Sequence, residues 1–363
     1  MMKRLKKLTA LLTAIGMVAA MSACGSDAAS SAAASSAASA GTEAAPAATE
    51  AAAPAEAGSA AETETAAADG DTYLIGICQL VQHEALDAAT QGFKDALTEK
   101  LGDKVKFDEQ NASGDSANCS TIVNGFLSEN VDLILANATA PLQAAAAATS
   151  EIPVLGTSVT DYATALEISD WSGTVGTNVS GTSDLAPLDQ QAEMLHDLFP
   201  DAKNVGLLYC SAEPNSVYQC TVIEGYLKDL GYNVTWYAFN DTNDVTSVTE
   251  TAADNSDVIY IPTDNTAASN TEAIANVVLA KKVPVIAGEE GIARGCGVAA
   301  LSISYYDLGY QTGLMAYDIL ANGADVSTMA VQTAPSVTKK YNAANAEALG
   351  ITIPDDYEAI AED

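Results

Sequence analysis

The sequence predicts an α/β protein of two Rossmann-like lobes with parallel sheets, joined by a multi-strand hinge. Three observations support this fold class. From residue 72 onward, short β-branched strands alternate with helical stretches, which is the pattern of parallel sheets covered by helices. Polar residues follow the strands abruptly, at the edge where open α/β sheets bind ligands. The same arrangement occurs twice along the chain, which predicts two similar lobes.

The repeat is clearest around two short strands. The segment 257–266 (DVIYIPTDNT) is an apolar run that stops at Pro262 and continues into Asp264 and its polar neighbours. The segment 132–139 (DLILANAT) has the same form and ends in Asn137 and Thr139. Because a polar loop after a buried strand meets the N-terminus of the next helix there, we expect these residues at the ligand-facing edge of each sheet.

Each element has its own sequence signal. Leu86, Ala89, Phe93 and Leu97 recur at helical spacing, which predicts an amphipathic helix after the first strand. The expected strands cover residues 73–80, 104–110, 131–136, 153–158, 204–210, 233–238, 258–261, 283–287 and 298–303. The expected helices cover 85–101, 116–128, a stretch from Pro141, 188–198, 217–230, a stretch before the strand at 258, 267–281 and 306–320.

The order of these elements predicts the division into lobes. We expect lobe 1 to comprise residues 72–180 and about 290–322, and lobe 2 to comprise 181–289 and about 323–363. The strand 298–303 and the helix after it are thus expected on lobe 1. Three passages of the chain between the lobes would form the hinge, which permits bending about one axis.

The first 71 residues precede this fold. A basic start, an apolar run over 8–20 and small residues before Cys24 resemble a bacterial lipoprotein signal. The apolar run is shorter than the roughly 20 residues of a transmembrane helix. We therefore predict a signal peptide over 1–23 and a lipid on Cys24. Residues 25–71 hold no aromatic side chain and are mostly Ala, Ser, Thr and Glu, which predicts a disordered tether.

Charge and cysteine usage exclude several classes of protein. The net charge of −33 would repel a phosphate backbone and anionic lipid headgroups, so nucleic acid is not an expected partner and the membrane is met through the lipid anchor alone. After Cys24, five cysteines remain, with no CxxC and no metal-ligand spacing, so no metal is expected. Cys210 and Cys220 could form one disulfide, or each cysteine could be a small buried apolar residue.

The sequence does not predict an enzyme. It has no GxSxG nucleophile elbow and no phosphate-binding P-loop. Its two histidines, His83 and His196, lie far apart, and the second falls inside an amphipathic helical stretch. A Ser-His-Asp arrangement is therefore not expected, and no cofactor is expected either.

The polar loops favour an amino acid as ligand. After the signal, Arg294 is the one arginine, so a guanidinium clamp for a carboxylate could come from one place alone. A ligand carboxylate would instead be held by backbone N–H groups and the hydroxyls of Thr139 and Ser158 in lobe 1. A ligand ammonium would meet Asp264 or Glu289 in lobe 2. Closure of the lobes would complete both sets of contacts.

Each candidate also has a structural explanation. Asp264, Thr139, Asn215 and Ser216 precede or begin helical stretches and could be helix caps. Three residues flank the end of the first strand and could line a side-chain pocket, with an imidazole as stacking face; these are Gln79, His83 and Glu84. The candidate ligand-binding residues are Gln79, His83, Glu84, Asn137, Thr139, Ser158, Asn215, Ser216, Asp264 and Glu289.

Several segments resemble the substrate-binding lipoproteins of one ABC uptake family. The resemblance spans nearly all of 72–363 and rests on 79–87 (QLVQHEALD), 159–161 (VTD), 215–216 (NS), 262–266 (PTDNT), 284–289 (PVIAGE) and 305–309 (YYDLG). It implies the type I periplasmic-binding-protein fold, capture of a small solute between the lobes and delivery to ABC permease subunits. Some members bind tryptophan or other aromatic amino acids.

We therefore expect a monomeric, lipid-anchored protein outside the cytoplasm that binds an aromatic amino acid such as tryptophan, tyrosine or phenylalanine. A sugar or nucleoside is the alternative ligand. Polyol sites generally use several Asp, Asn and Arg side chains, and the single Arg294 counts against them. A receptor that senses its ligand without transport is the alternative role.

Overall fold

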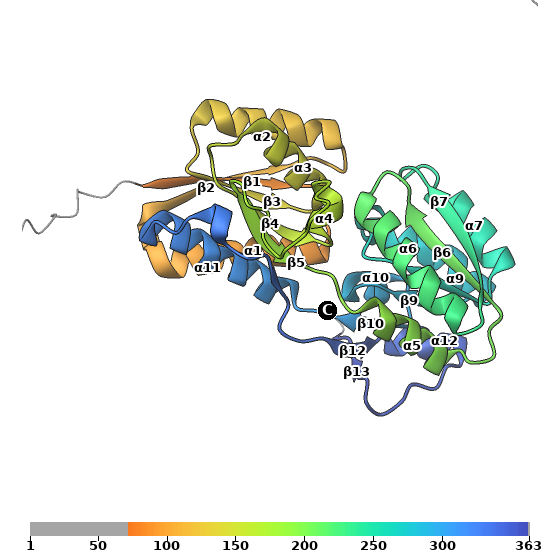
Figure 1. Ribbon diagram of the computed structural model, residues 1–363. Helices are drawn as coiled ribbons and strands as arrows, with labels where there is room; N and C mark the ends of the chain where they lie inside the picture. Colours follow the sequence, from red (N-terminus) through yellow and green to blue (C-terminus); the bar gives the residue numbers. More distant parts are fainter. Residues whose placement is uncertain (1–71, 362–363) are drawn as a thin grey trace, which may run out of the picture. The chain divides into compact units, whose positions relative to one another are not determined.

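The computed structural model describes residues 72–361, which form two lobes, each with a central β-sheet between helices (Figure 1). The two-lobed α/β fold that the sequence predicts is confirmed. The expected signal peptide, Cys24 and the tether lie outside the described residues. Within 72–361, no helix has the length and apolarity needed to cross a membrane.

Lobe 1 contains a six-stranded sheet whose pairings are all parallel. In spatial order its strands are β11 (Gln332–Thr333), β5 (Val179–Ser183), β4 (Val154–Val159), β3 (Leu133–Asn137), β1 (Tyr73–Gln79) and β2 (Val105–Asn111). All residues of β3 and β4 are buried. Such burial is typical of strands covered by helices on both faces of the sheet.

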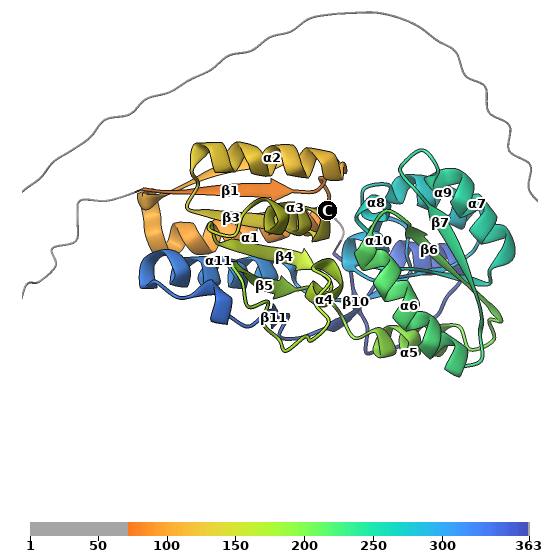
Figure 2. The same ribbon diagram turned by 45° about the horizontal axis from the view of Figure 1, so that its top comes forward.

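The helices of lobe 1 cover the two faces of this sheet (Figure 2). On one face, α2 (Ser116–Glu129) and α3 (Thr139–Ala148) contribute to one apolar cluster. On the other, α1 (Glu84–Leu101) and α11 (Tyr305–Asn322) contribute Phe93 and Met315 to a second cluster. The short helix α4 (Tyr162–Ala165) follows β4, and two 3₁₀ turns, η1 (Gly102–Lys104) and η2 (Val326–Thr328), complete the lobe.

Lobe 2 contains a seven-stranded sheet. In spatial order its strands are β13 (Glu358–Ala359), β12 (Thr338–Tyr341), β10 (Ala299–Ser302), β9 (Val285–Ala287), β8 (Val258–Ile261), β6 (Asn204–Cys210) and β7 (Asn233–Phe239). Its helices are α5 (Leu188–Leu198), α6 (Pro214–Asp229), α7 (Val245–Asn255), α8 (Asn265–Ala268), α9 (Thr271–Lys281), α10 (Glu290–Gly295) and α12 (Ala343–Leu349). The expected parallel pairing fails at one place, because β12 runs antiparallel to β10.

The sequence-based prediction that the strand 298–303 belongs to lobe 1 is wrong. This segment forms β10, which pairs with β9 and β12 in the second sheet. The six-residue helix α10 is long enough to connect β9 to its parallel neighbour, so the chain stays in lobe 2 until Ser302. Two other boundaries also differ, since β5 extends to Ser183 within the first sheet and β11 returns residues 332–333 to it.

The chain passes between the sheets at three places among the described residues. These passages are 184–187 after β5, 303–304 after β10 and 334–337 after β11. A hydrogen bond of 2.9 Å connects Asp184 Oδ2 in the first passage with the hydroxyl of Tyr305, the residue that follows the second. A hinge of several connected passages restricts the lobes to bending motions.

The close packing of α1 against α11 requires glycine. A Cβ atom placed at Gly309 would lie 1.9 Å from the backbone oxygen of Ala89. We expect Gly309→Ala to lower the free energy of unfolding by about 1–3 kcal/mol, because the helices must separate. Urea unfolding measures this loss.

Gly125 provides the control, since a Cβ there meets nothing within 4 Å and the residue is an exposed position of α2. Gly125→Ala should stabilise the protein by up to about 1 kcal/mol through helix propensity. Equal midpoints for Gly309→Ala and the wild type would contradict the proposed close packing.

Candidate functional site

A small buried cavity lies at the carboxyl ends of strands from both sheets. Its volume is about 10 Å³. Lobe 1 and the hinge contribute His83, Leu86, Ser158, Thr160, Asp184 and Tyr305 to its wall. Lobe 2 contributes Asn215, Thr263, Asp264, Asn265, Ala268 and Glu289. A volume of this size accommodates about one water molecule, so a larger ligand requires the lobes to part.

Ser158 faces the cavity from a strained position at the end of β4. Its backbone φ is +55°, and the register of β4 against β5 shifts between Gly156 and Val159. Irregularities of this kind redirect a side chain, and strained residues of this kind concentrate at binding sites. The Ser158 hydroxyl is buried and has no hydrogen-bond partner among the described residues. It is therefore available to a ligand.

Asp264 combines both roles that the sequence left open. Its Oδ1 accepts a hydrogen bond of 2.8 Å from the N–H of Ala267, and it thereby caps α8. Its Oδ2 accepts one of 2.6 Å from the N–H of Cys210, and the side chain also lines the cavity. Burial raises the pKa of Asp264, and the nearby charge of Glu213 raises it further.

Glu289 has the same architecture at the start of α10. Its two carboxylate oxygens accept hydrogen bonds from the N–H groups of Gly291 at 2.6 Å and Ile292 at 2.5 Å. These donors favour the charged form, but burial dominates and raises the pKa of Glu289 to about 7. The cavity wall thus includes a second carboxylate that is costly to ionise.

Asp184 is a third buried carboxylate, and sequence reasoning missed it. Its Oδ2 accepts the Tyr305 hydroxyl, whereas its Oδ1 has no partner among the described residues. Burial raises the pKa of Asp184, although the hydroxyls of Tyr305 and Thr160 offset part of the effect. Asp184, like Asp264, is a polar residue that comes shortly after a strand. The preceding strand, VSGTS, is too short and polar to be recognised by its apolar pattern.

Glu213 is a further residue that the sequence did not reveal. Its carboxylate accepts hydrogen bonds from the backbone N–H groups and side chains of Asn265 and Thr266, at 2.7–3.0 Å. Asn215 Nδ2 donates a fifth at 3.1 Å. Glu213 therefore fixes the loop that places Asp264 and Asn265 at the cavity.

Polar contacts connect the lobes beside the cavity. The His83 Nε2 atom lies 3.1 Å from Asn265 Oδ1. Because Asn265 Nδ2 donates to Glu213, its Oδ1 is the acceptor and His83 donates. Burial lowers the pKa of His83, which favours the neutral imidazole.

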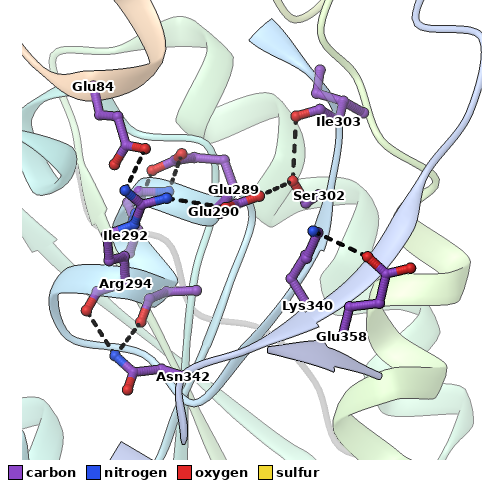
Figure 3. A network of polar contacts seen from close by, with 12 residues as sticks. Glu84, Glu289, Glu290, Ile292, Arg294, Ser302, Ile303, Lys340, Asn342 and Glu358 are labelled. Carbon is purple, nitrogen blue, oxygen red and sulfur yellow. Dashed lines mark hydrogen bonds and ion pairs between the residues drawn. The ribbon is translucent and has the colours of Figure 1, made fainter. Parts of the chain in front are cut away.

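An ion pair adds a second connection between the lobes (Figure 3). Arg294 Nη1 lies 2.8 Å from Glu84 Oε1, and Arg294 also pairs with Glu290 at 3.1 Å. Glu290 in turn accepts a hydrogen bond of 2.8 Å from the Ser302 hydroxyl. The arginine that the sequence analysis considered as a ligand clamp is thus engaged in linking α10 to α1.

The structure brings together five of the ten predicted residues. The cavity wall contains His83, Ser158, Asn215, Asp264 and Glu289 and does not contain Gln79, Glu84, Asn137, Thr139 or Ser216.

The residues outside the wall have contacts of their own. Gln79 and Asn137 hydrogen-bond Thr90 and so join the sheet to α1. Thr139 begins α3, and Ser216 is buried beside Asp264 and hydrogen-bonds its carboxylate.

Other predicted features concern metals and cysteines. Within 72–361, no three His, Cys, Asp or Glu side chains are grouped so as to hold a metal ion. The five cysteines of this part of the chain are free and buried. The disulfide considered between Cys210 and Cys220 is therefore not formed, and both side chains belong to apolar clusters.

Comparison with known proteins gives consistent matches. The family model for ABC transporter substrate binding protein matches residues 74–363. A tyrosine-binding protein of Clostridioides difficile is 36% identical over 280 residues, which cover 76% of this chain and 81% of that protein.

Two solved structures extend this similarity. An ABC domain from Streptococcus pneumonia in complex with L-Trp has a TM-score of 0.75 at 32% identity, covering 78% of this chain and 96% of that one. A ligand-free, open substrate binding protein with adhesive properties from Clostridium difficile has a TM-score of 0.62 at 36% identity, covering 80% and 100%. The TM-score against this open, ligand-free structure is lower than that against the complex with L-Trp.

The Glu84–Arg294 ion pair should favour closure. Since both side chains are partly exposed, the pair contributes at most about 1 kcal/mol, so Glu84→Gln should raise the ratio of open to closed molecules by up to about fivefold. Small-angle scattering of the ligand-free protein should then give a larger radius of gyration. Glu358→Gln breaks the pair with Lys340 inside lobe 2 and should leave the scattering unchanged. Identical curves for the two variants would argue against the ion pair as a closing contact.

The raised pKa of Glu289 predicts a dependence of stability on pH. The folded protein holds this proton up to about pH 7, whereas the unfolded chain releases it near 4.5. The contribution to stability is therefore fully present below about pH 4.5 and is lost as the pH rises to 7, by up to about 3 kcal/mol. Glu289→Gln should reduce this loss in urea unfolding measured across the same pH range. An unchanged pH profile would show that Glu289 ionises normally.

Proposed function

This chain belongs to the ABC transporter substrate binding protein family, and on that premise we propose that it captures an aromatic amino acid between its lobes and delivers it to an ABC permease. The cavity at the carboxyl ends of both sheets is the observation that carries the proposal. Its wall combines three carboxylates with the hydroxyls of Ser158 and Thr160, and it contains no lysine or arginine. An ammonium group suits the carboxylates, and a carboxylate suits the hydroxyl and backbone donors.

The relatives support an aromatic side chain. One is named a tyrosine-binding protein and another was solved with L-Trp, at 36% and 32% identity. Structures with bound rhamnose or myo-inositol are 14% and 15% identical and share the fold alone. The sugar alternative therefore has less support than the amino acid.

The ring of the ligand would occupy space beside the cavity. A neighbouring pocket of about 280 Å³ shares His83, Ala268 and Glu289 with the cavity wall, and Arg294 lies in the wall of this pocket, where it pairs with Glu84 and Glu290. A small separation of the lobes would join the two spaces and approach the volume of roughly 300 Å³ at which ligand pockets begin. His83, neutral and partly exposed, would offer its ring face to the aromatic side chain.

The location of the protein forms part of the proposal. Proteins of this family act outside the cytoplasm, where they hold a solute for the permease. We propose that Cys24 carries the lipid anchor and that the protein is a monomer. The sequence before residue 72 supports the anchor through its basic start, apolar run and small residues before Cys24.

Isothermal calorimetry tests the ligand class. L-tryptophan, L-tyrosine or L-phenylalanine should bind the purified protein with a Kd of about 1 μM or tighter, which corresponds to about 8 kcal/mol. L-leucine and D-glucose are the controls for an apolar amino acid and a polyol. Millimolar or weaker binding by all three aromatic amino acids would refute the proposal, and tight binding of glucose would favour the sugar alternative.

A further inference from the structure

Three buried carboxylates of the cavity wall are candidates to bind a positively charged ligand group. All three residues are almost fully buried: Asp184 is 3% exposed, Asp264 is 1% exposed and Glu289 is 3% exposed. No lysine or arginine shares the cavity wall with them. Because a buried carboxylate without a cation is costly, a ligand ammonium group is attracted to this wall. The hydrogen-bond partners of each carboxylate decide where the ammonium group binds.

The carboxylates of Asp264 and Glu289 already accept hydrogen bonds from the protein itself. Each oxygen of both carboxylates accepts a backbone N–H, at distances between 2.5 and 2.8 Å. These bonds cap α8 and α10, so the side chains are held in place without a ligand. An ammonium group at either residue would share oxygens that are satisfied.

Asp184 differs in one respect. Its Oδ2 accepts the Tyr305 hydroxyl at 2.9 Å, but its buried Oδ1 accepts no hydrogen bond from the described residues. Leaving a buried acceptor without a donor costs free energy that a ligand donor would recover. The other unpartnered side-chain atom of the cavity wall is the Ser158 hydroxyl. Both residues belong to the cavity wall, where an ionised Asp184 oxygen can only accept a hydrogen bond and the Ser158 hydroxyl can also donate one.

We propose that Asp184 Oδ1 binds the α-ammonium group of the ligand and so makes the site specific for a free amine. This inference rests on the proposed function and names the residue that recognises the amine. It replaces the sequence-based expectation that Asp264 or Glu289 has this role. The Ser158 hydroxyl then donates to the ligand carboxylate next to the amine.

The position of Asp184 agrees with a ligand oriented along the cavity. The pocket beside the cavity shares His83, Ala268 and Glu289 with it, and its wall includes neither Asp184 nor Ser158. The polar end of the ligand therefore lies towards Asp184, and the side chain extends towards His83. Since Asp184 belongs to one hinge passage and its partner Tyr305 follows another, the amine also binds where the lobes are joined.

Two ligands that differ by the amine test this assignment. L-tryptophan is compared with indole-3-propionate, and L-tyrosine with 3-(4-hydroxyphenyl)propionate, by calorimetry. The wild type should prefer the amino acid by about 100-fold or more, as for other buried charge pairs. Asp184→Asn should lose most of this preference, because the amino acid binds more weakly while the analogue binds as before.

Glu289→Gln tests the rival assignment, and it should still prefer the amino acid over the analogue even where it binds both more weakly. Glu358→Gln, which lies outside both pockets, is the control and should bind as the wild type does. Tyr305→Phe keeps the Asp184 carboxylate but removes a hydroxyl that lowers its pKa. The ionised form that binds an ammonium group then becomes less favourable, so the affinity for the amino acid should fall more than the affinity for the analogue. This variant tests the inference even where Asp184→Asn fails to fold.

Two outcomes would overturn the inference. Asp184→Asn or Tyr305→Phe could discriminate between the paired ligands as the wild type does, or Glu289→Gln could lose the discrimination instead. Both differ from a failure of the proposed function, in which the wild type binds neither amino acid.

Discussion

The buried carboxylates around the interlobe cavity determine most of what this protein can do. Three of them line a wall without lysine or arginine, and burial raises the pKa of each. Two are compensated by the N-termini of α8 and α10. The third, Asp184, accepts the Tyr305 hydroxyl on one oxygen, and the hydroxyls of Tyr305 and Thr160 lower its pKa in part. Buried carboxylates without a cationic partner are costly, which is the physical basis for the proposal that the ligand carries a positive charge.

The contacts between the two lobes are weaker than the contacts inside each lobe. Inside each lobe, buried strands and helices form extensive apolar clusters. Between the lobes, the polar contacts beside the cavity include the His83–Asn265 hydrogen bond, the Gln219–Thr160 hydrogen bond at 3.5 Å and the partly exposed Glu84–Arg294 ion pair. Exposed pairs contribute little, so a ligand can shift the equilibrium between open and closed forms with modest binding energy. Rigid lobes with weakly held closure suit a protein that must both capture and release its solute.

The sequence predicted what depends on local pattern. Alternating strands and helices, the duplicated lobes and the polar loops that hold Ser158, Asp264 and Glu289 are all recognisable from residue types and spacing. The location of β10 was not, because sheet membership depends on tertiary pairing with β9 and β12. Asp184 was missed since the strand before it, Val179–Ser183, is too polar to be recognised. Glu213 was missed because its role depends on a loop about 50 residues later in the chain.

A crystal structure of the complex with L-tryptophan or L-tyrosine would show which carboxylate binds the ammonium group. We expect the amino acid between the lobes, with its ammonium nitrogen about 3 Å from Asp184 Oδ1 and its ring beside His83. This expectation would be contradicted by a ligand bound outside this cavity, or by an ammonium group that contacts Asp264 or Glu289 while Asp184 Oδ1 stays without a donor.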